Sequence, residues 1–144
     1  MAKLLIVYHS QSGNTEAMAK AFYEGAVSSG ATVSLKKAAD TTSDDLIDCD
    51  AVAIGTPNYF SYMAGAVKDL FDRTFYAVRG KADGKPYVLF GSHGGGENKA
   101  LDSIDRICNA LQFRRAFDDV LAAGKPLPDV LEQCRELGKK LAES

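Results

Sequence analysis

Apolar and polar positions recur along the chain with two periods, and these predict strands and helices in regular succession. Short apolar runs without alternation occur at residues 3–8, 51–55 and 85–91, and such runs are typical of strands covered on both faces. In the run at 31–36 apolar and polar residues alternate more, which predicts a strand nearer the sheet edge. A less regular stretch at 113–121 is interpreted as the fifth strand.

Apolar residues at helical spacing fill the intervals between these strands. They predict helices over residues 15–28, 67–78 and 97–111, and a last helix introduced by two prolines near residue 128. One short helix is expected within residues 40–50, where a threonine and a serine are candidate caps. Helices therefore follow the strands one by one.

This alternation predicts an α/β doubly wound three-layer sandwich, with residues 1–144 forming a single domain. The length suits a five-stranded parallel sheet of order 2-1-3-4-5, with helices on both faces. Ligands bind such sheets beyond the carboxyl ends of the strands, at the switch point between strands 1 and 3. The loops Ser10–Thr15, Thr56–Tyr62 and Ser92–Gly96 should meet there.

The first loop has the composition of an anion site. Ser10-Gln11-Ser12-Gly13-Asn14-Thr15 lies between a strand and a helix, so hydroxyls, an amide and free backbone N–H groups face one point. It holds no lysine or arginine, and the pattern G-x-x-x-x-G-K-[ST] is absent, which favours one terminal phosphate over a triphosphate. The alternative is an ordinary helix cap made by Ser12 or Asn14.

The other two loops suit a planar ring. Tyr59, Phe60 and Tyr62 could form a flat apolar wall, although each could instead turn inward. The glycines 94–96 allow close approach of the backbone to a ligand, or form a mere connector. A terminal phosphate, a planar ring and hydrogen bonds to the ring edges together describe flavin mononucleotide (FMN).

At these residues the sequence resembles the flavodoxin-like FMN-binding family. Residues 10–15 match its [ST]-x-[ST]-G-[NH]-T phosphate loop, and residues 55–73 look like the multimeric-flavodoxin and quinone-reductase (WrbA-like) branch. The resemblance implies FMN as cofactor, bound by Ser10, Gln11, Ser12, Gly13, Asn14, Thr15, Thr56, Pro57, Asn58, Tyr59, Phe60, Ser61, Ser92, His93, Gly94, Gly95 and Gly96.

The chain departs from the WrbA-like branch in two ways and from the electron-carrier flavodoxins in one. It has no room for the insertion that long relatives use in tetramer assembly, so a monomer or dimer is expected. Ser61 stands where the branch usually has glycine. The only ring in the third loop is His93, where electron-carrier flavodoxins often place a stacking tyrosine.

Composition excludes several other classes of protein. The net charge is −2 and no lysine or arginine run exceeds two residues, which argues against nucleic acid as a partner. No apolar run exceeds six residues, which is too short to cross a membrane. The three widely spaced cysteines and two histidines suggest no metal cluster, and they predict buried thiols in a reducing cytoplasm. A strand beginning at residue 3 leaves no room for a signal peptide.

The sequence lacks the motifs of other protein classes that have related folds. No aspartate follows strand 3 as in receiver domains, no cysteine follows strand 1 as in C-x5-R phosphatases, and no G-x-S-x-G elbow occurs. No side chain is an obvious catalyst, so the cofactor would supply the chemistry.

Two functions remain. The first is an electron carrier serving redox partner proteins, with the acids of residues 40–50 either steering basic partners or simply forming solvated surface. The second is an NAD(P)H oxidoreductase acting on a quinone-like acceptor. In that enzyme Tyr59, Phe60 and His93 would shape the acceptor pocket, with His93 as a proton donor or a hydrogen-bonding group at the ligand edge. The short chain and the lack of a nicotinamide motif favour the carrier.

Overall fold

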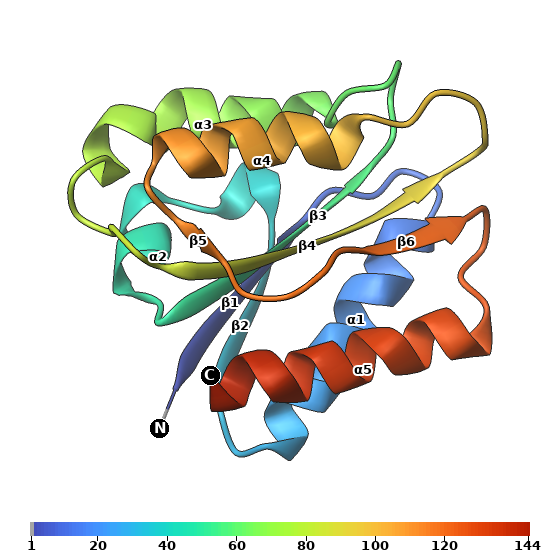
Figure 1. Cartoon of the computed structure of the whole chain (residues 1–144), viewed down its shortest axis with the longest axis horizontal. Coiled ribbons are helices and arrows are strands. Elements are labelled where there is room, and N and C mark those ends of the chain that lie inside the picture. The colour runs from blue at the N-terminus through green and yellow to red at the C-terminus, as the bar shows by residue number, and fades with distance from the viewer. Residues whose placement is uncertain (1) are drawn as a thin grey trace.

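Parallel strands form one twisted sheet between two layers of helices (Figure 1). The structure is a computed structural model and describes residues 2–144. The strands are β1 (Lys3–Tyr8), β2 (Thr32–Lys37), β3 (Ala51–Pro57), β4 (Pro86–His93), β5 (Arg114–Arg115) and β6 (Val120–Ala123). The helices are α1 (Asn14–Ser28), the 3-10 turn η1 (Ala38–Asp40), α2 (Ser43–Asp48), α3 (Gly65–Val78), α4 (Ala100–Ala110) and α5 (Pro128–Glu143).

The strand order is β2-β1-β3-β4-β5, with every pair parallel, which confirms the predicted order. The predicted fifth strand is two pieces. β5 pairs with Pro86 and Tyr87 of β4, whereas β6 pairs with residues 90–93 further along the same strand. The chain leaves the sheet between them, and there Phe117 packs against the apolar residues on the α5 side.

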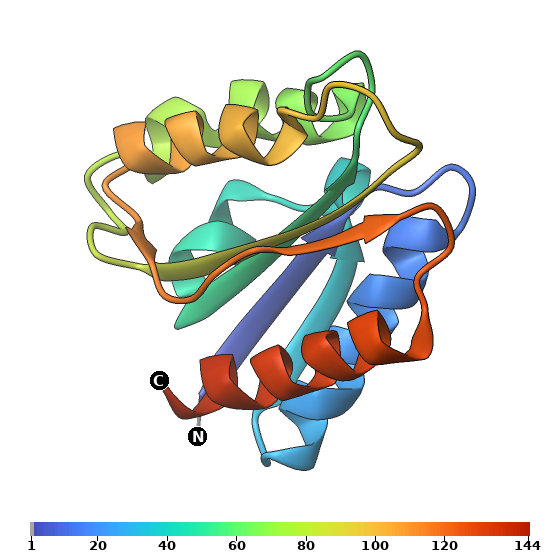
Figure 2. The same ribbon diagram turned by 45° about the vertical axis from the view of Figure 1, so that its right-hand side comes forward.

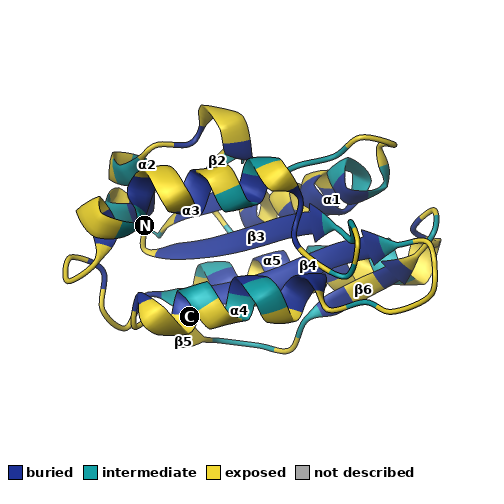
Figure 3. Cartoon of the chain, turned by 90° about the horizontal axis from the view of Figure 1, so that it is seen from above, coloured by how far each residue is buried: buried dark blue, intermediate teal, exposed yellow. Residues whose placement is uncertain are grey.

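The helices divide between the two faces of the sheet, as right-handed crossovers require. Helices α1 and α5 cover one face and α2, α3 and α4 cover the other, as Figures 1 and 2 show. Each layer encloses its own apolar core. Strands β3 and β4 are buried along nearly their whole length, whereas β2 at the edge is half exposed (Figure 3). The unbroken apolar runs therefore mark the central strands, as predicted.

Two glycines allow α1 and α5 to pack closely. A Cβ atom on Gly25 would lie 1.9 Å from the carbonyl oxygen of Arg135, and one on Gly138 would lie 2.3 Å from that of Phe22. Both distances are far below contact, so any larger residue would push the helices apart. This packing holds α1, and with it the loop before α1, against the sheet.

Several element boundaries differ from the predicted ones at the carboxyl ends of the strands. β3 continues to Pro57 and β4 to His93, so part of each predicted loop is strand. Helix α4 begins at Ala100 instead of residue 97, with Lys99 as its N-cap. In the loop before it, Gly95 and Gly96 adopt left-handed φ values of 109° and 73°. The short helix α2 is capped as expected: the Thr42 hydroxyl accepts from the amide of Asp45 at 3.2 Å. None of the helices in residues 2–144 has the length and apolarity needed to cross a bilayer.

Candidate functional site

Direct hydrogen bonds join the three loops beyond the carboxyl ends of the central strands, on the right-hand side of Figure 2. The Tyr59 hydroxyl donates to Oε1 of Gln11 at 2.8 Å, which links the second loop to the first. The amide of Asn58 donates to the carbonyl of Ser92 at 2.9 Å, which links the second loop to the third. The predicted convergence of these loops is therefore confirmed.

The first loop leaves the N-terminus of α1 open. Gly13 is the N-cap with a left-handed φ of 97°, and no side chain among residues 2–144 caps the helix. The alternative that Ser12 or Asn14 acts as a cap is therefore wrong. The Ser10 hydroxyl instead accepts from the amide of Gly13 at 3.1 Å, which tightens the turn. The first amides of α1 and its positive dipole end are left for an anion.

Thr15 is held differently from the rest of this loop. Its side chain is buried, and its hydroxyl lies 2.8 Å from the hydroxyl of Ser92 on β4. Either oxygen can donate in this pair. Thr15 thus ties the first turn of α1 to the end of β4, and direct contact of its hydroxyl with a phosphate stays a prediction.

The second loop is a tight hairpin whose tip points into solvent. Tyr59 and Tyr62 exchange backbone hydrogen bonds of 3.0 and 3.1 Å, and between them Phe60 and Ser61 adopt left-handed φ values of 57° and 60°. Two such residues are the geometry of a type I′ turn, which usually needs Asn or Gly. Phe60 is fully exposed, so the alternative that its ring turns inward is wrong.

Tyr59 is the aromatic residue of this loop that packs against the first loop. Its ring meets His9 edge to face at 6.2 Å between centroids, and burial raises the pKa of its phenol. Tyr62 is 41% exposed. The predicted aromatic wall therefore consists of one anchored ring beside two exposed ones.

Asn58 carries an unused buried acceptor. Its Nδ2 donates to the carbonyl of Glu97 at 3.0 Å, whereas Oδ1 is buried and accepts no hydrogen bond from residues 2–144. A buried carbonyl oxygen without a donor is unfavourable and suits a ligand that brings an N–H group. The site thus offers donors at the α1 end and an acceptor between the second and third loops, which fits a phosphate joined to a ring that carries N–H groups.

The polar side chains of three other predicted residues form hydrogen bonds with backbone groups in and around the loops. The Thr56 hydroxyl donates to the carbonyl of Pro57 at 2.7 Å and accepts from the amide of Ala64 at 2.9 Å. The Ser61 hydroxyl accepts from the amide of Lys99, and Nδ1 of His93 accepts from the amide of Gly95. These contacts shape the loops, and direct binding by the three side chains stays a prediction.

Sequence reasoning missed residues that complete the site on the β2 side. A cavity of about 470 Å³ is bounded by the first loop together with Tyr8, Glu16, Lys37, Ala39 and Ala66. The predicted order 2-1-3 could have indicated these residues, because it places the end of β2 at the same edge as the first loop. The local sequence near Lys37, however, has no feature that marks a binding site.

Tyr8 and Glu16 form a polar pair on the wall of this cavity. The Tyr8 hydroxyl donates to Oε2 of Glu16 at 2.8 Å. Burial, and then the neighbouring carboxylate, raise the pKa of Tyr8 to about 12. The same hydrogen bond, with Lys20 nearby, lowers the pKa of Glu16, which therefore stays ionised.

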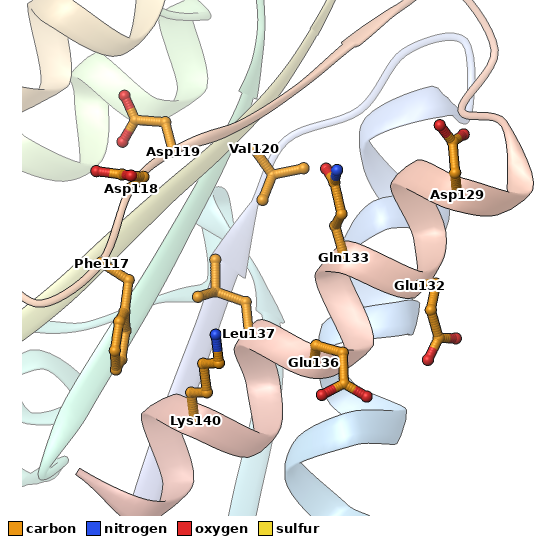
Figure 4. Close-up of a pocket in the computed structure, with 10 residues that line it drawn as sticks. All are labelled: Phe117, Asp118, Asp119, Val120, Asp129, Glu132, Gln133, Glu136, Leu137 and Lys140. Atoms are coloured by element: carbon orange, nitrogen blue, oxygen red, sulfur yellow. The ribbon is translucent and has the colours of Figure 1, made fainter.

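A larger cavity of about 590 Å³ lies away from these loops, between α5 and the segment that precedes β6 (Figure 4). Five carboxylates and one lysine line it, above apolar side chains such as Leu137. So many negative charges would repel a phosphate. No group of three or more His, Cys, Asp or Glu within residues 2–144 could hold a metal ion. The three joined loops are therefore the better candidate for a cofactor site.

Comparison with known proteins agrees with this geometry. The family model for flavodoxin matches residues 6–138. A flavodoxin of Clostridium beijerinckii is 31% identical, with 95% of this chain and 97% of the relative covered. NAD(P)H dehydrogenase (quinone) 3 of Rhizobium meliloti is 36% identical over 72% of this chain, which spans only 60% of that relative.

A solved structure supports the same assignment. The structure of a flavodoxin from the domain Archaea superposes with a TM-score of 0.87 at 29% identity, over 98% of this chain and 96% of the other. The fold, the uncapped N-terminus of α1 and these similarities agree, and the chain belongs to the flavodoxin family.

Proposed function

We propose that this chain binds FMN where its three loops meet and acts as an electron-transfer carrier. Members of the flavodoxin family bind FMN. The observation that carries the proposal for this chain is the uncapped N-terminus of α1, whose amides face the same edge as the orphan oxygen of Asn58. When bound, FMN supplies the redox chemistry, and the protein supplies binding and orientation.

Each part of the site has a distinct task in this proposal. The amides and hydroxyls of residues 10–14 hold the terminal phosphate, and hydrogen bonds to a charged group contribute about 1.5–3 kcal/mol each. Asn58 accepts from an N–H group of the ring. The residues around Tyr59 and residues 92–96 bound the ring and exclude water from its edges.

The exposed tip of the second loop favours a carrier over an enzyme. The Phe60 ring projects fully into solvent beside the site, where it offers apolar surface to a partner protein. A carrier needs such a contact because its electrons leave through the surface. The acids of residues 40–50 add negative charge that would attract basic partners.

The second candidate function is reduction of a quinone-like acceptor by NAD(P)H. The 36% identity to NAD(P)H dehydrogenase (quinone) 3 of Rhizobium meliloti supports it. In that case Phe60 and His93 would border the acceptor instead of a protein surface.

Reconstitution followed by anaerobic reduction tests both functions. Protein mixed with FMN should turn yellow and keep the flavin through gel filtration, and a protein that takes up no FMN would overturn the proposal. A carrier should accept electrons one at a time at two separate potentials and oxidise NAD(P)H slowly. Rapid NAD(P)H oxidation with a quinone, with electrons taken up in pairs, would favour the enzyme.

A pair of glycine variants tests the phosphate loop. Gly13 and Gly30 both have left-handed φ values, 97° and 85°, and a Cβ on either would meet no atom within 4 Å. Gly13→Ala and Gly30→Ala should therefore lose similar stability, about 1 kcal/mol. Only Gly13→Ala should weaken FMN binding. Equal FMN affinity in the two variants would show that the loop does not hold the phosphate.

We also propose that residues 1–144 work as one FMN-binding domain, in the cytoplasm, as a monomer or dimer. The three cysteines are all unpaired and buried, which suits a reducing compartment. Light scattering during gel filtration of the FMN complex would reveal the oligomeric state, and a tetramer would contradict this proposal.

A further inference from the structure

The first loop contains no cation, yet the fold brings one to it. Lys37 is the last residue of β2, and its exposed side chain lines the same cavity as residues 10–13. The two segments are more than twenty positions apart in the sequence. Only the pairing of β1 with β2 places them side by side, because Tyr8 is in register with Lys37.

Lys37 is free to act on a ligand. Within residues 2–144 it makes no ion pair or side-chain hydrogen bond. Its neighbour Lys36 is committed elsewhere, since its Nζ lies 2.9 Å from both carboxylate oxygens of Asp45. The two adjacent lysines therefore differ in two respects. Lys37 lines the cavity and has no ion-pair partner within residues 2–144, whereas Lys36 is absent from the cavity lining and is paired with Asp45.

The cavity also contains an opposing charge. Glu16 lines it as a carboxylate, hydrogen-bonded by Tyr8 and with Nζ of Lys20 3.8 Å away. Lys37 attracts Glu16 and helps to lower the pKa of its carboxyl group. Without Lys37 this carboxylate would repel a phosphate in the neighbouring loop more strongly. Lys37 is thus placed both to attract the phosphate and to offset Glu16.

We propose that Lys37 supplies the positive charge that the phosphate loop lacks, so that the site favours a phosphorylated flavin over riboflavin. The inference rests on the FMN function proposed above. It is an electrostatic effect across a solvated cavity and needs no direct contact. Its strength should therefore fall as salt screens the charges.

The test compares the dissociation constants of FMN and riboflavin, measured from the quenching of flavin fluorescence at low ionic strength. Lys37→Met should weaken FMN binding about fivefold at low ionic strength, the order of magnitude expected when a unit charge near a dianion is removed in a solvated site. Riboflavin binding should not change. Lys37→Arg should retain the wild-type affinity for FMN, and Lys37→Glu should weaken it beyond Lys37→Met.

Lys36→Met is the matched control. It removes the same charge one position away, and it should change FMN affinity less than twofold. Added salt should weaken FMN binding to the wild type more than to Lys37→Met. Equal effects of the two methionine variants, or an equal loss of riboflavin affinity in Lys37→Met, would overturn the inference while leaving FMN binding intact. A wild-type protein that binds no FMN would instead overturn the proposed function.

Discussion

The hydroxyl of Thr15 lies 2.8 Å from that of Ser92, although 77 positions separate the two residues in the chain. Both side chains are buried. The contact joins the first turn of α1 to the carboxyl end of β4, so it sets the spacing between the first loop (Ser10–Thr15) and the third loop (Ser92–Gly96). A site for a cofactor that spans both loops depends on that spacing.

We expect Thr15→Val and Ser92→Ala each to lower the free energy of unfolding by about 1–3 kcal/mol, because each leaves one buried hydroxyl without a partner. The double variant should lose less than the sum of the two, since neither hydroxyl then remains. Urea denaturation of the four proteins measures this coupling. Strictly additive losses would show that the two hydroxyls do not interact.

Asn58→Ala should weaken FMN binding about tenfold, the effect of losing one hydrogen bond of about 1–1.5 kcal/mol. The stability of the protein without flavin should change little, because the variant removes both the Nδ2 bond to Glu97 and the unsatisfied Oδ1. Flavin fluorescence titration measures the affinity. Asn109→Ala, at an exposed position on α4, is the control. Unchanged affinity in Asn58→Ala would mean that the orphan oxygen does not face the ring.

Phe60→Ala should leave the free energy of unfolding within about 0.5 kcal/mol of the wild type, because its ring is fully exposed. Phe71→Ala, in the core beneath α3, should lose about 3–5 kcal/mol. If Phe60 contacts redox partners, its removal should slow electron transfer to them. Stopped-flow reduction of a partner protein checks this, and an unchanged rate would remove Phe60 from the docking surface.

Lys85 is a buried lysine that stabilises the end of α2. Its Nζ donates to the carbonyl oxygens of Leu46, Ile47 and Cys49 at 2.6, 2.8 and 2.5 Å, and only 8% of the residue is exposed. Lys85→Met should lower the free energy of unfolding by about 2–4 kcal/mol, because three buried carbonyls lose their donor. In urea denaturation, Lys81→Met on the surface should have almost no effect. A loss below about 1 kcal/mol for Lys85→Met would contradict this account.

The Tyr8 phenol should make stability fall at alkaline pH. Its pKa is raised to about 12, whereas an unfolded tyrosine titrates near 10. The folded state therefore favours the neutral phenol. This contribution is complete below about pH 10 and is lost as pH rises through about 12. The stability advantage of wild type over Tyr8→Phe should shrink over that window, and urea denaturation at both ends of it measures the change. A constant difference would show that the pKa of Tyr8 is not raised.

Much of the architecture follows from local patterns. The unbroken apolar runs identified β1, β3 and β4 as central strands, and the alternation at 31–36 identified β2 as an edge strand. Neighbouring residues alone determine whether a segment can be covered on one face or two, so such features can be read from the sequence. The order 2-1-3-4-5 was expected from five strands in a chain of this length, and the meeting of the three loops followed from that order. Right-handed crossovers placed helices on both faces.

The sequence by itself thus determined the fold, the switch-point edge and the composition of the loops that meet there. Only the tertiary structure decided that the fifth strand splits in two and that Phe60 points outward. It also decided that Oδ1 of Asn58 has no donor within residues 2–144 and that Lys37 lines the same cavity as the first loop. These features depend on how side chains distant in sequence fill shared space. Their energies are set by contacts that no local pattern contains.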